Sequence, residues 1–154
     1  MTRKLTPTTK QNAISGKETL VGYATWNESS STYATTYTVL PGVTTIGAPT
    51  VTVNDIDQTC IAEDSKRTIA GVSEGGDVTI VFHKYTGDAT QKAFFDLAQS
   101  QKTVKVCYEY QDESTCEFEL QLKTSQFSGD PSMDETLKLE VTGMVQGKPT
   151  YTLK

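Results

Sequence analysis

The residues of this chain that could perform catalysis are few and form no recognisable set. His83 is the one histidine of the sequence, and it falls within an expected strand. There is no Gly-x-Ser-x-Gly nucleophile elbow, which requires a turn from a strand into a helix, and no known cysteine–histidine motif. We therefore expect no enzymatic activity and no cofactor.

A glycine-rich stretch, Gly71 to Gly76, is the one segment that resembles a phosphate-binding loop. It lacks the Gly-Lys-Ser/Thr ending of such loops, and a strand is expected after it instead of the N-terminus of a helix. We interpret its glycines as backbone positions that a side chain would obstruct.

Four carboxylates between residues 55 and 64 could in principle bind calcium. They are Asp55, Asp57, Glu63 and Asp64. Their spacing is not that of an EF-hand loop, which has a glycine at its centre and a closing glutamate. The segment therefore predicts a solvated acidic loop and no metal site.

The cysteines predict neither a zinc site nor a disulfide framework. Cys60, Cys107 and Cys116 are odd in number and include no Cys-x-x-Cys pair. Cys107 and Cys116 flank an expected turn, and strand alternation places Cys116 on the apolar side and Cys107 on the polar side. Unless a bulge intervenes, these two cannot bond within that hairpin.

Length and charge predict one acidic domain preceded by a basic arm. The chain has 154 residues, enough for a single domain, which we place at residues 17–154 after a flexible arm at residues 1–16. Up to residue 17 the only charged side chains are four basic ones, whereas the remainder carries ten basic and nineteen acidic residues. Because an acidic body repels phosphates, we do not expect the folded part to bind DNA tightly.

Membrane insertion and secretion are not indicated. No run approaches the roughly 18 apolar residues that a membrane span needs. The start, Met1-Thr2-Arg3-Lys4, lacks the apolar core of a signal peptide. We expect a protein made in a cytoplasm.

Alternation of apolar and polar residues predicts a chain rich in β-strands. One amphipathic helix interrupts the strands over Ala89 to Gln101, with Asp88 as its N-cap. Residues 55–70 carry no clear pattern and predict a long loop or an extended hairpin. The fold class is therefore mainly β with one helix. The expected strands are Leu20–Trp26, Tyr37–Leu40, Val51–Val53, Val78–Tyr85, Thr103–Tyr110, Thr115–Lys123 and Glu135–Val145.

The helix has one apolar face that we expect to pack on the sheet. Its inward residues are predicted to be Ala93, Phe94, Leu97 and Ala98. The outward candidates are Gln91, Lys92, Asp96, Gln99 and Gln101.

The strands that follow the helix form the clearest hairpin in the sequence. We expect its apolar side to face the core. Its other side carries charged and amide groups and is expected either to meet water or to line a cavity or channel. A Gly147-Lys148-Pro149 turn is expected after the last strand. The polar side of the hairpin consists of Lys105, Glu109, Glu117, Glu119 and Gln121.

The order of these motifs resembles that of the major tail tube proteins of long-tailed bacteriophages, over roughly residues 51–150. The matching features are Ile56-Asp57-Gln58-Thr59, the Gly71 to Asp77 stretch leading into Val78 to Phe82, Gly87 and the helix with Phe94-Phe95-Asp96-Leu97, the polar-faced hairpin, and the Thr136 to Val145 strand before Gly147-Lys148-Pro149.

The resemblance implies a β-sandwich or barrel with one flanking helix, a fold shared with the tube proteins of secretion systems. It also implies a structural virion protein that assembles into hexameric rings, which stack head to tail into a tube for DNA delivery. Implied partners are further copies of the chain and the tape-measure, tail-terminator and distal tail proteins. DNA would pass through the lumen without specific binding. The implied location is the virion tail, assembled in the cytoplasm of the bacterial host.

By the same analogy, two groups of residues acquire expected roles. The lumen-facing candidates are Lys105, Glu109, Glu117, Glu119 and Gln121, where carboxylates would keep DNA from adhering. The candidates for contacts between subunits or rings are Arg3, Lys4, Lys10, Asp57, Glu63, Asp64, Lys66 and Arg67.

Two other functions remain open at this point. A tube protein of a secretion or injection apparatus would share the fold and the rings but conduct protein. A monomeric β-sandwich binding module, such as a host-recognition domain, would need no assembly.

Overall fold

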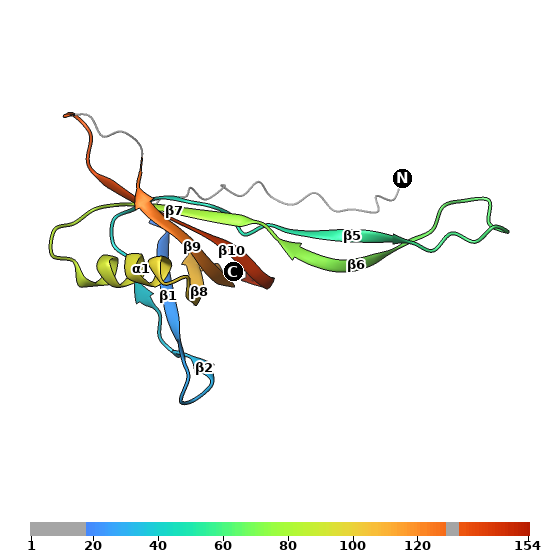
Figure 1. Cartoon of the computed structure of the whole chain (residues 1–154), viewed down its shortest axis with the longest axis horizontal. Coiled ribbons are helices and arrows are strands. Elements are labelled where there is room, and N and C mark those ends of the chain that lie inside the picture. Colours follow the sequence, from blue (N-terminus) through green and yellow to red (C-terminus); the bar gives the residue numbers. More distant parts are fainter. Residues whose placement is uncertain (1–17, 129–132) are drawn as a thin grey trace, which may run out of the picture.

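One strongly curved antiparallel sheet, a single helix and a projecting hairpin make up the computed structural model (Figure 1). It describes residues 18–128 and 133–154, so the arm predicted at residues 1–16, with Arg3, Lys4 and Lys10, lies outside the described residues. The strand order is β2-β1-β8-β9-β10-β7-β4, with β3 also paired to β1. The elements are β1 (Leu20–Asn27), β2 (Thr32–Tyr33), β3 (Thr38–Val39), β4 (Val43–Ile46), β5 (Val51–Asp57), β6 (Thr68–Gly75), β7 (Asp77–His83), α1 (Ala89–Gln99), β8 (Thr103–Glu109), β9 (Thr115–Phe127) and β10 (Lys138–Thr152).

The sheet curls around a core that its two ends share. The ring of Phe94 on α1 lies 4.9 Å from that of Tyr23 on β1 and 6.2 Å from that of Phe82 on β7, measured between centroids. In the strand order, β8, β9 and β10 separate β1 from β7. Two strands so far apart in one sheet can reach the same side chain only if the sheet wraps around it. The expected mainly β fold with one flanking helix is confirmed.

The segment from β3 to β4 closes the gap between the two ends of the sheet. Val39 in β3 pairs with Gly22 in β1, whereas Val43 in β4 pairs with Phe82 in β7. Between them Gly42 has φ +75°, a conformation that glycine adopts without strain. This corner lets one short segment satisfy backbone groups at both ends of the sheet, which gives the fold its barrel-like closure.

The sheet bends where β10 passes Gly143. The register between β9 and β10 shifts at Thr142/Gly143, which marks a β-bulge. A Cβ at Gly143 would lie 2.7 Å from both the carbonyl oxygen of Gln121 and the Cγ of Leu120. Only glycine lets the two strands approach this closely at the bend.

The helix begins where the sequence predicts, and Phe94, Leu97 and Ala98 face the core as expected, but the core-facing stripe includes Gln91 in place of Ala93. The carboxylate of Asp88 accepts a hydrogen bond from the backbone N–H of Gln91 at 2.9 Å and caps the helix. The inward residues are Gln91, Phe94 and Ala98, spaced three and four apart. The prediction for Ala93 was wrong, because it lies outside this stripe and is exposed.

Gln91, predicted to face outward, is buried. Its side-chain oxygen accepts from the backbone N–H of Tyr85 at 2.8 Å, and its amide nitrogen donates to the carbonyls of Pro41 and His83 at 3.0 and 2.6 Å. A buried amide is stable when its donors and acceptors are satisfied, as they are here. The side chain therefore ties the start of the helix to both the β3–β4 corner and the end of β7.

The last strand is longer than its apolar pattern suggests. The predicted turn at Gly147-Lys148-Pro149 was wrong, because β10 continues to Thr152 through a register shift between Gln146 and Thr150. Gly147 lies within this shift and has φ +71°, a backbone conformation that glycine adopts without strain. The strand resumes because the start of β9 offers it hydrogen-bonding partners as far as Thr115.

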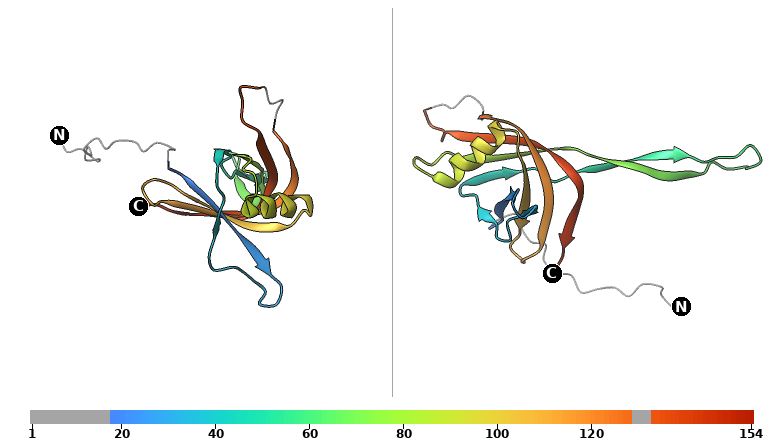
Figure 2. Two further views of the ribbon diagram at one scale, coloured as in Figure 1. Left: turned by 90° about the vertical axis from the view of Figure 1, so that its left-hand side faces the viewer. Right: turned by 60° about the horizontal axis from the view of Figure 1, so that its bottom comes forward.

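Residues 51–75 form a two-stranded hairpin that projects away from the sheet (Figure 2, right). β5 pairs with β6 from Val51 and Gly75 to Asp57 and Thr68, with the tip at residues 58–67. The glycines of β6 are sterically required, as the sequence predicts. A Cβ at Gly71 would lie 2.7 Å from the carbonyl oxygen of Asn54, and one at Gly75 would overlap the backbone of β10.

Replacing Phe94 by alanine tests whether this residue holds the curled sheet together. Phe94 is 1% exposed, so we expect Phe94→Ala to lower the free energy of unfolding by about 3–5 kcal/mol. Urea unfolding followed by circular dichroism measures the loss. The exposed Asp96→Ala on the same helix is the control and should change stability by less than about 0.5 kcal/mol. Equal effects of the two substitutions would contradict the assignment.

Candidate functional site

The polar side chains of the β8–β9 hairpin share one face of the sheet, opposite the core. They alternate with buried residues along both strands, so each points away from the core. Lys105 lies directly across from Glu119 in the strand register. The structure therefore brings together all five residues that the sequence places on this face, namely Lys105, Glu109, Glu117, Glu119 and Gln121.

A segment that we call the strap, residues 31–37, lies along this polar face. Tyr37 donates a hydrogen bond from its hydroxyl to a carboxylate oxygen of Glu117 at 2.8 Å. Burial, followed by this hydrogen bond, raises the pKa of Tyr37. Burial and the neighbouring Glu119 likewise raise the pKa of Tyr33. No local pattern indicates these contacts, because Tyr37 and Glu117 are 80 positions apart.

The electrostatic character of the polar face is negative. Three of its side chains are carboxylates and one is a lysine. Cys107 lies among them, and burial together with the charges of Glu117 and Glu109 raises the pKa of its thiol to about 11. Lys105 opposes this shift only weakly. A surface with this net negative charge repels phosphate groups.

Local hydrogen bonds organise the tip of the projecting hairpin. Asp57 accepts from the backbone N–H of Thr59 at 2.8 Å, and hydrogen bonds from Thr59 lower the pKa of this carboxyl group. Glu63 accepts from the backbone N–H of Cys60 at 3.1 Å and lies 3.4 Å from the guanidinium of Arg67. Asp64 and Lys66 belong to the same tip. The acidic segment is therefore a structured turn and not an irregular loop.

The same hairpin exposes large apolar side chains. Ile56 is paired with Ile69 across the two strands, and both are about half exposed. Val72 is 82% exposed, and Ile61 at the tip is fully exposed. A two-stranded hairpin has no core of its own in which to bury such groups. Exposed apolar surface on a projecting element is typical of a contact with another molecule.

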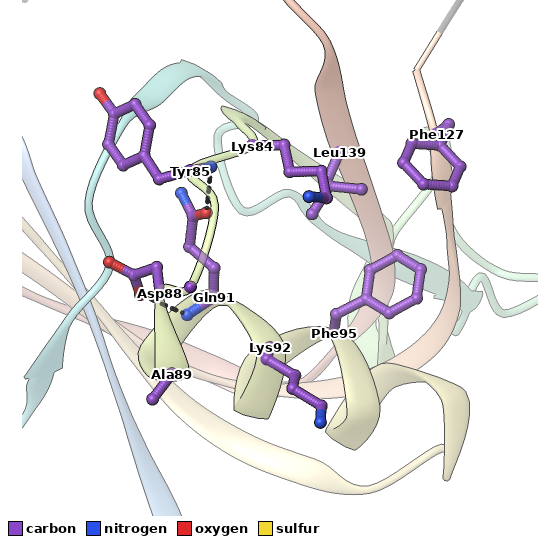
Figure 3. A pocket seen from close by; sticks show the side chains of 10 residues that line it. Lys84, Tyr85, Asp88, Ala89, Gln91, Lys92, Phe95, Phe127 and Leu139 are labelled. Carbon is purple, nitrogen blue, oxygen red and sulfur yellow. Dashed lines mark hydrogen bonds between the residues drawn. The ribbon is translucent and has the colours of Figure 1, made fainter.

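A pocket of about 430 Å³ lies between α1, the last residue of β9 and the first residues of β10 (Figure 3). Phe95, Phe127 and Leu139 give it an apolar lining, and Lys84 and Lys92 also line it. Phe127 is 55% exposed at this place. Sequence analysis missed the pocket, because its residues come from three separate parts of the chain and share no motif.

His83 is the last residue of β7. Within residues 18–128 and 133–154, no group of three His, Cys, Asp or Glu side chains could hold a metal ion. Nδ1 of His83 lies 2.7 Å from the Thr136 hydroxyl oxygen. The sequence does contain the letters Gly-x-Ser-x-Gly, at Gly71-Val72-Ser73-Glu74-Gly75, so the expectation was wrong on the pattern itself. These residues lie within β6, paired with β5, and make no strand-to-helix turn.

Cys107 and Cys116 lie on opposite sides of the sheet, as strand alternation predicts. Cys116 is buried on the core side and Cys107 lies on the polar side, and both are free thiols, as is the exposed Cys60. The described part of the chain contains no helix long and apolar enough to cross a membrane.

Solved structures of tail tubes and related injection machines share this fold. The tail tube of SPP1 superimposes with a TM-score of 0.66 at 13% identity, covering 92% of this chain and 80% of that one. The tail of an empty gene transfer agent particle gives 0.62 at 12% identity, covering 92% of this chain and all of that one. The sheath/tube terminator of PVC, an extracellular contractile injection system, gives 0.67 at 11% identity over 93% of this chain and 99% of that one.

The chain has the tail-tube fold. No family model and no curated protein sequence matches it. The likeness therefore lies in the three-dimensional arrangement, at identities of 11–13%.

Thiol alkylation tests the environment of the polar face. With a pKa of about 11, roughly one Cys107 thiol in a thousand is ionised at pH 8, and the thiolate is the reactive form. We expect iodoacetamide at pH 8 to label the exposed Cys60 and to spare Cys107 and the buried Cys116. Labelling of Cys107 should rise as the pH approaches 11. Peptide mass spectrometry measures each site, and urea-unfolded protein, labelled at all three, is the control. Equal rates at Cys60 and Cys107 at pH 8 would contradict this environment.

Proposed function

We propose that this chain is the structural subunit of a tail tube, in which six copies form a ring and rings stack head to tail into a conduit for DNA. The observation that carries the proposal is the tail-tube fold over more than nine-tenths of the chain. The gene transfer agent tail, one of the similar structures, has C6 symmetry. In this role the protein belongs to the virion tail, and it needs neither catalysis nor a cofactor.

The polar face of β8 and β9 is proposed to line the lumen. Its excess of carboxylates over Lys105 repels phosphate, so DNA slides past without adhering. The strap adds hydroxyl-bearing side chains beside Glu117 and Glu119. These neutral groups offer no cation to which a phosphate could bind.

The free edge of β10 is proposed to join neighbouring subunits within a ring. β7 pairs with β10 only as far as Met144, so beyond the Val145 contact with Gly76 the described residues supply no partner strand to this edge. Tyr151 and Leu153 are exposed at its end. A strand edge of this kind is satisfied when another subunit completes the sheet.

Contacts between rings are proposed for the hairpin tip and the N-terminal arm. At the tip the contributing charges are those of Asp57, Glu63, Asp64, Lys66 and Arg67. The arm would add Arg3, Lys4 and Lys10. One surface pair repeated head to tail does not close, and so generates a filament. The tape-measure, tail-terminator and distal tail proteins are the further partners that a phage tail would supply.

A tube subunit of an injection apparatus is the second candidate function. The TM-score of 0.67 with the PVC sheath/tube terminator supports it about as well as the score of 0.66 with the SPP1 tail tube supports the first. Neighbouring genes distinguish the two functions. A tape-measure gene favours the phage tail, whereas an ATPase and a sheath gene favour an apparatus that conducts protein.

Electron microscopy of the purified protein tests the assembly. We expect rings or tubes with six-fold symmetry, at least when the initiator complex of the tail is added. The reason is that the free β10 edge and the apolar hairpin remain unsatisfied in the monomer. A protein that stays monomeric at high concentration, with and without the initiator, would instead support a binding module.

Charge reversal tests the lumen assignment. We expect Glu117→Lys combined with Glu119→Lys to leave tubes intact and to lower DNA delivery by about tenfold or more, because lysines bind passing phosphates. Infectivity assays measure delivery. Asp134→Lys with Glu135→Lys is the control, since it reverses two exposed charges away from this face. Glu117→Gln removes the negative charge but keeps an oxygen that can accept the hydrogen bond from Tyr37, so it separates the two effects. Normal infectivity of the lysine variant would remove the lumen assignment.

A further inference from the structure

The apolar pocket beside α1 and the apolar hairpin β5–β6 are two unsatisfied surfaces of the same chain. We propose that the pocket receives the hairpin of a second copy of this chain, in the adjacent ring. This inference rests on the proposed tube function and goes beyond it by naming the receiving surface. Ile61 at the hairpin tip is the side chain that enters the pocket.

The hairpin has the shape and composition of an inserted element. Ile61 is fully exposed at its tip. Behind it, Ile56, Ile69 and Val72 extend the exposed apolar surface toward the sheet. Seven residues of β5 span about 23 Å at roughly 3.3 Å each, so the tip stands well clear of its own subunit. It is therefore free to reach another molecule.

The pocket offers what such a tip needs. Phe95, Phe127 and Leu139 form its apolar lining in a volume of about 430 Å³. Burying the isoleucine there removes apolar area of both partners from water. Within the described residues neither Lys84 nor Lys92 takes part in a salt bridge. Their charges remain available to a partner.

Charge complementarity favours the hairpin over the N-terminal residues as the occupant of the pocket. Residues 51–75 carry five carboxylates and two basic side chains, a net charge of −3. Lysines at the pocket attract this element. The N-terminal arm carries only basic charges up to Lys17, so the same lysines repel it. With Lys84 and Lys92 against the one carboxylate of Asp88, the pocket lining carries a net charge of +1, which favours the acidic hairpin over the basic arm.

The two surfaces lie at opposite ends of the molecule. Figure 1 shows α1 at one end of the long axis and the hairpin tip at the other. A subunit therefore cannot insert its hairpin into its own pocket. Each copy donates one hairpin and receives one, which is a heterologous contact that repeats without closing. This is the geometry required to add ring upon ring.

Disulfide trapping tests the contact directly, because Cys60 is adjacent to Ile61 and exposed. In assembled tubes of Lys92→Cys, mild oxidation should join Cys60 of one copy to the new cysteine of the next. We expect a ladder of covalent multimers on a non-reducing gel. Cys60→Ser in the same background should abolish the ladder. Glu28→Cys, in the exposed β1–β2 loop away from the pocket, is the positional control and should give none.

Different results would contradict the tube function and the contact between pocket and hairpin. Wild-type protein that forms no tubes contradicts the tube function itself. Tubes of Lys92→Cys that give no ladder, or in which the new cysteine is protected from maleimide without joining Cys60, overturn the pocket assignment and leave the tube function intact. A ladder from Glu28→Cys instead would place the hairpin elsewhere and also overturn it.

A charge swap provides an independent measurement that does not depend on trapping. Lys84→Glu with Lys92→Glu should lower the fraction of protein in tubes by about tenfold, because like charges then meet. Adding Asp55→Lys and Asp64→Lys, two exposed positions of the same hairpin, should restore assembly. Tube yields unchanged by the lysine substitutions, or a loss that the hairpin substitutions do not rescue, would count against the contact.

Discussion

The structure depends on the burial of one side chain, Phe94, between the two ends of a curled sheet. Its ring contacts β1 and β7, which are separated in the sheet by three other strands. Because one helix supplies this contact, the sheet can bury its whole inner face around a single core without a second layer of helices. Gln91 strengthens the arrangement by tying the helix to the corner at Pro41. The outer face, the free edge of β10 and the hairpin are then left for other molecules.

The chain therefore combines a core whose buried polar atoms are hydrogen-bonded with a surface that leaves large apolar side chains exposed. The described core contains no buried side-chain nitrogen or oxygen atom without a hydrogen-bond partner. Outside it, the hairpin exposes Ile61 and Val72, and Phe127 lies half exposed at the pocket. Such an imbalance is expected of a protein whose remaining burial takes place on assembly. Placing the apolar projection and the apolar pocket at opposite ends suits a polymer better than a closed dimer.

Local patterns predicted several parts of this molecule correctly. The cap at Asp88, the two faces of the β8–β9 hairpin and the separation of Cys107 from Cys116 all follow from short-range periodicity and capping chemistry. The errors arose where distant segments meet. Gln91 is buried because the β3–β4 corner lies above it, and β10 continues past Gly147 because β9 offers partners there. The strap was missed because Tyr37 and Glu117 are brought together only by the curl of the sheet.

The sequence by itself determined seven of the strands in whole or in part, where the helix begins, and that one side of the β8–β9 hairpin is polar and acidic; it did not indicate β2, β4 or β6. These features depend on residues a few positions apart, so the chain specifies them before it folds. Only the tertiary structure decided that the sheet closes around Phe94 and that the β5–β6 hairpin projects away from the sheet. It alone also decided that a pocket forms between α1, the end of β9 and the start of β10. These features depend on pairings between residues tens of positions apart, and no local pattern encodes which distant strand edge or side chain will meet.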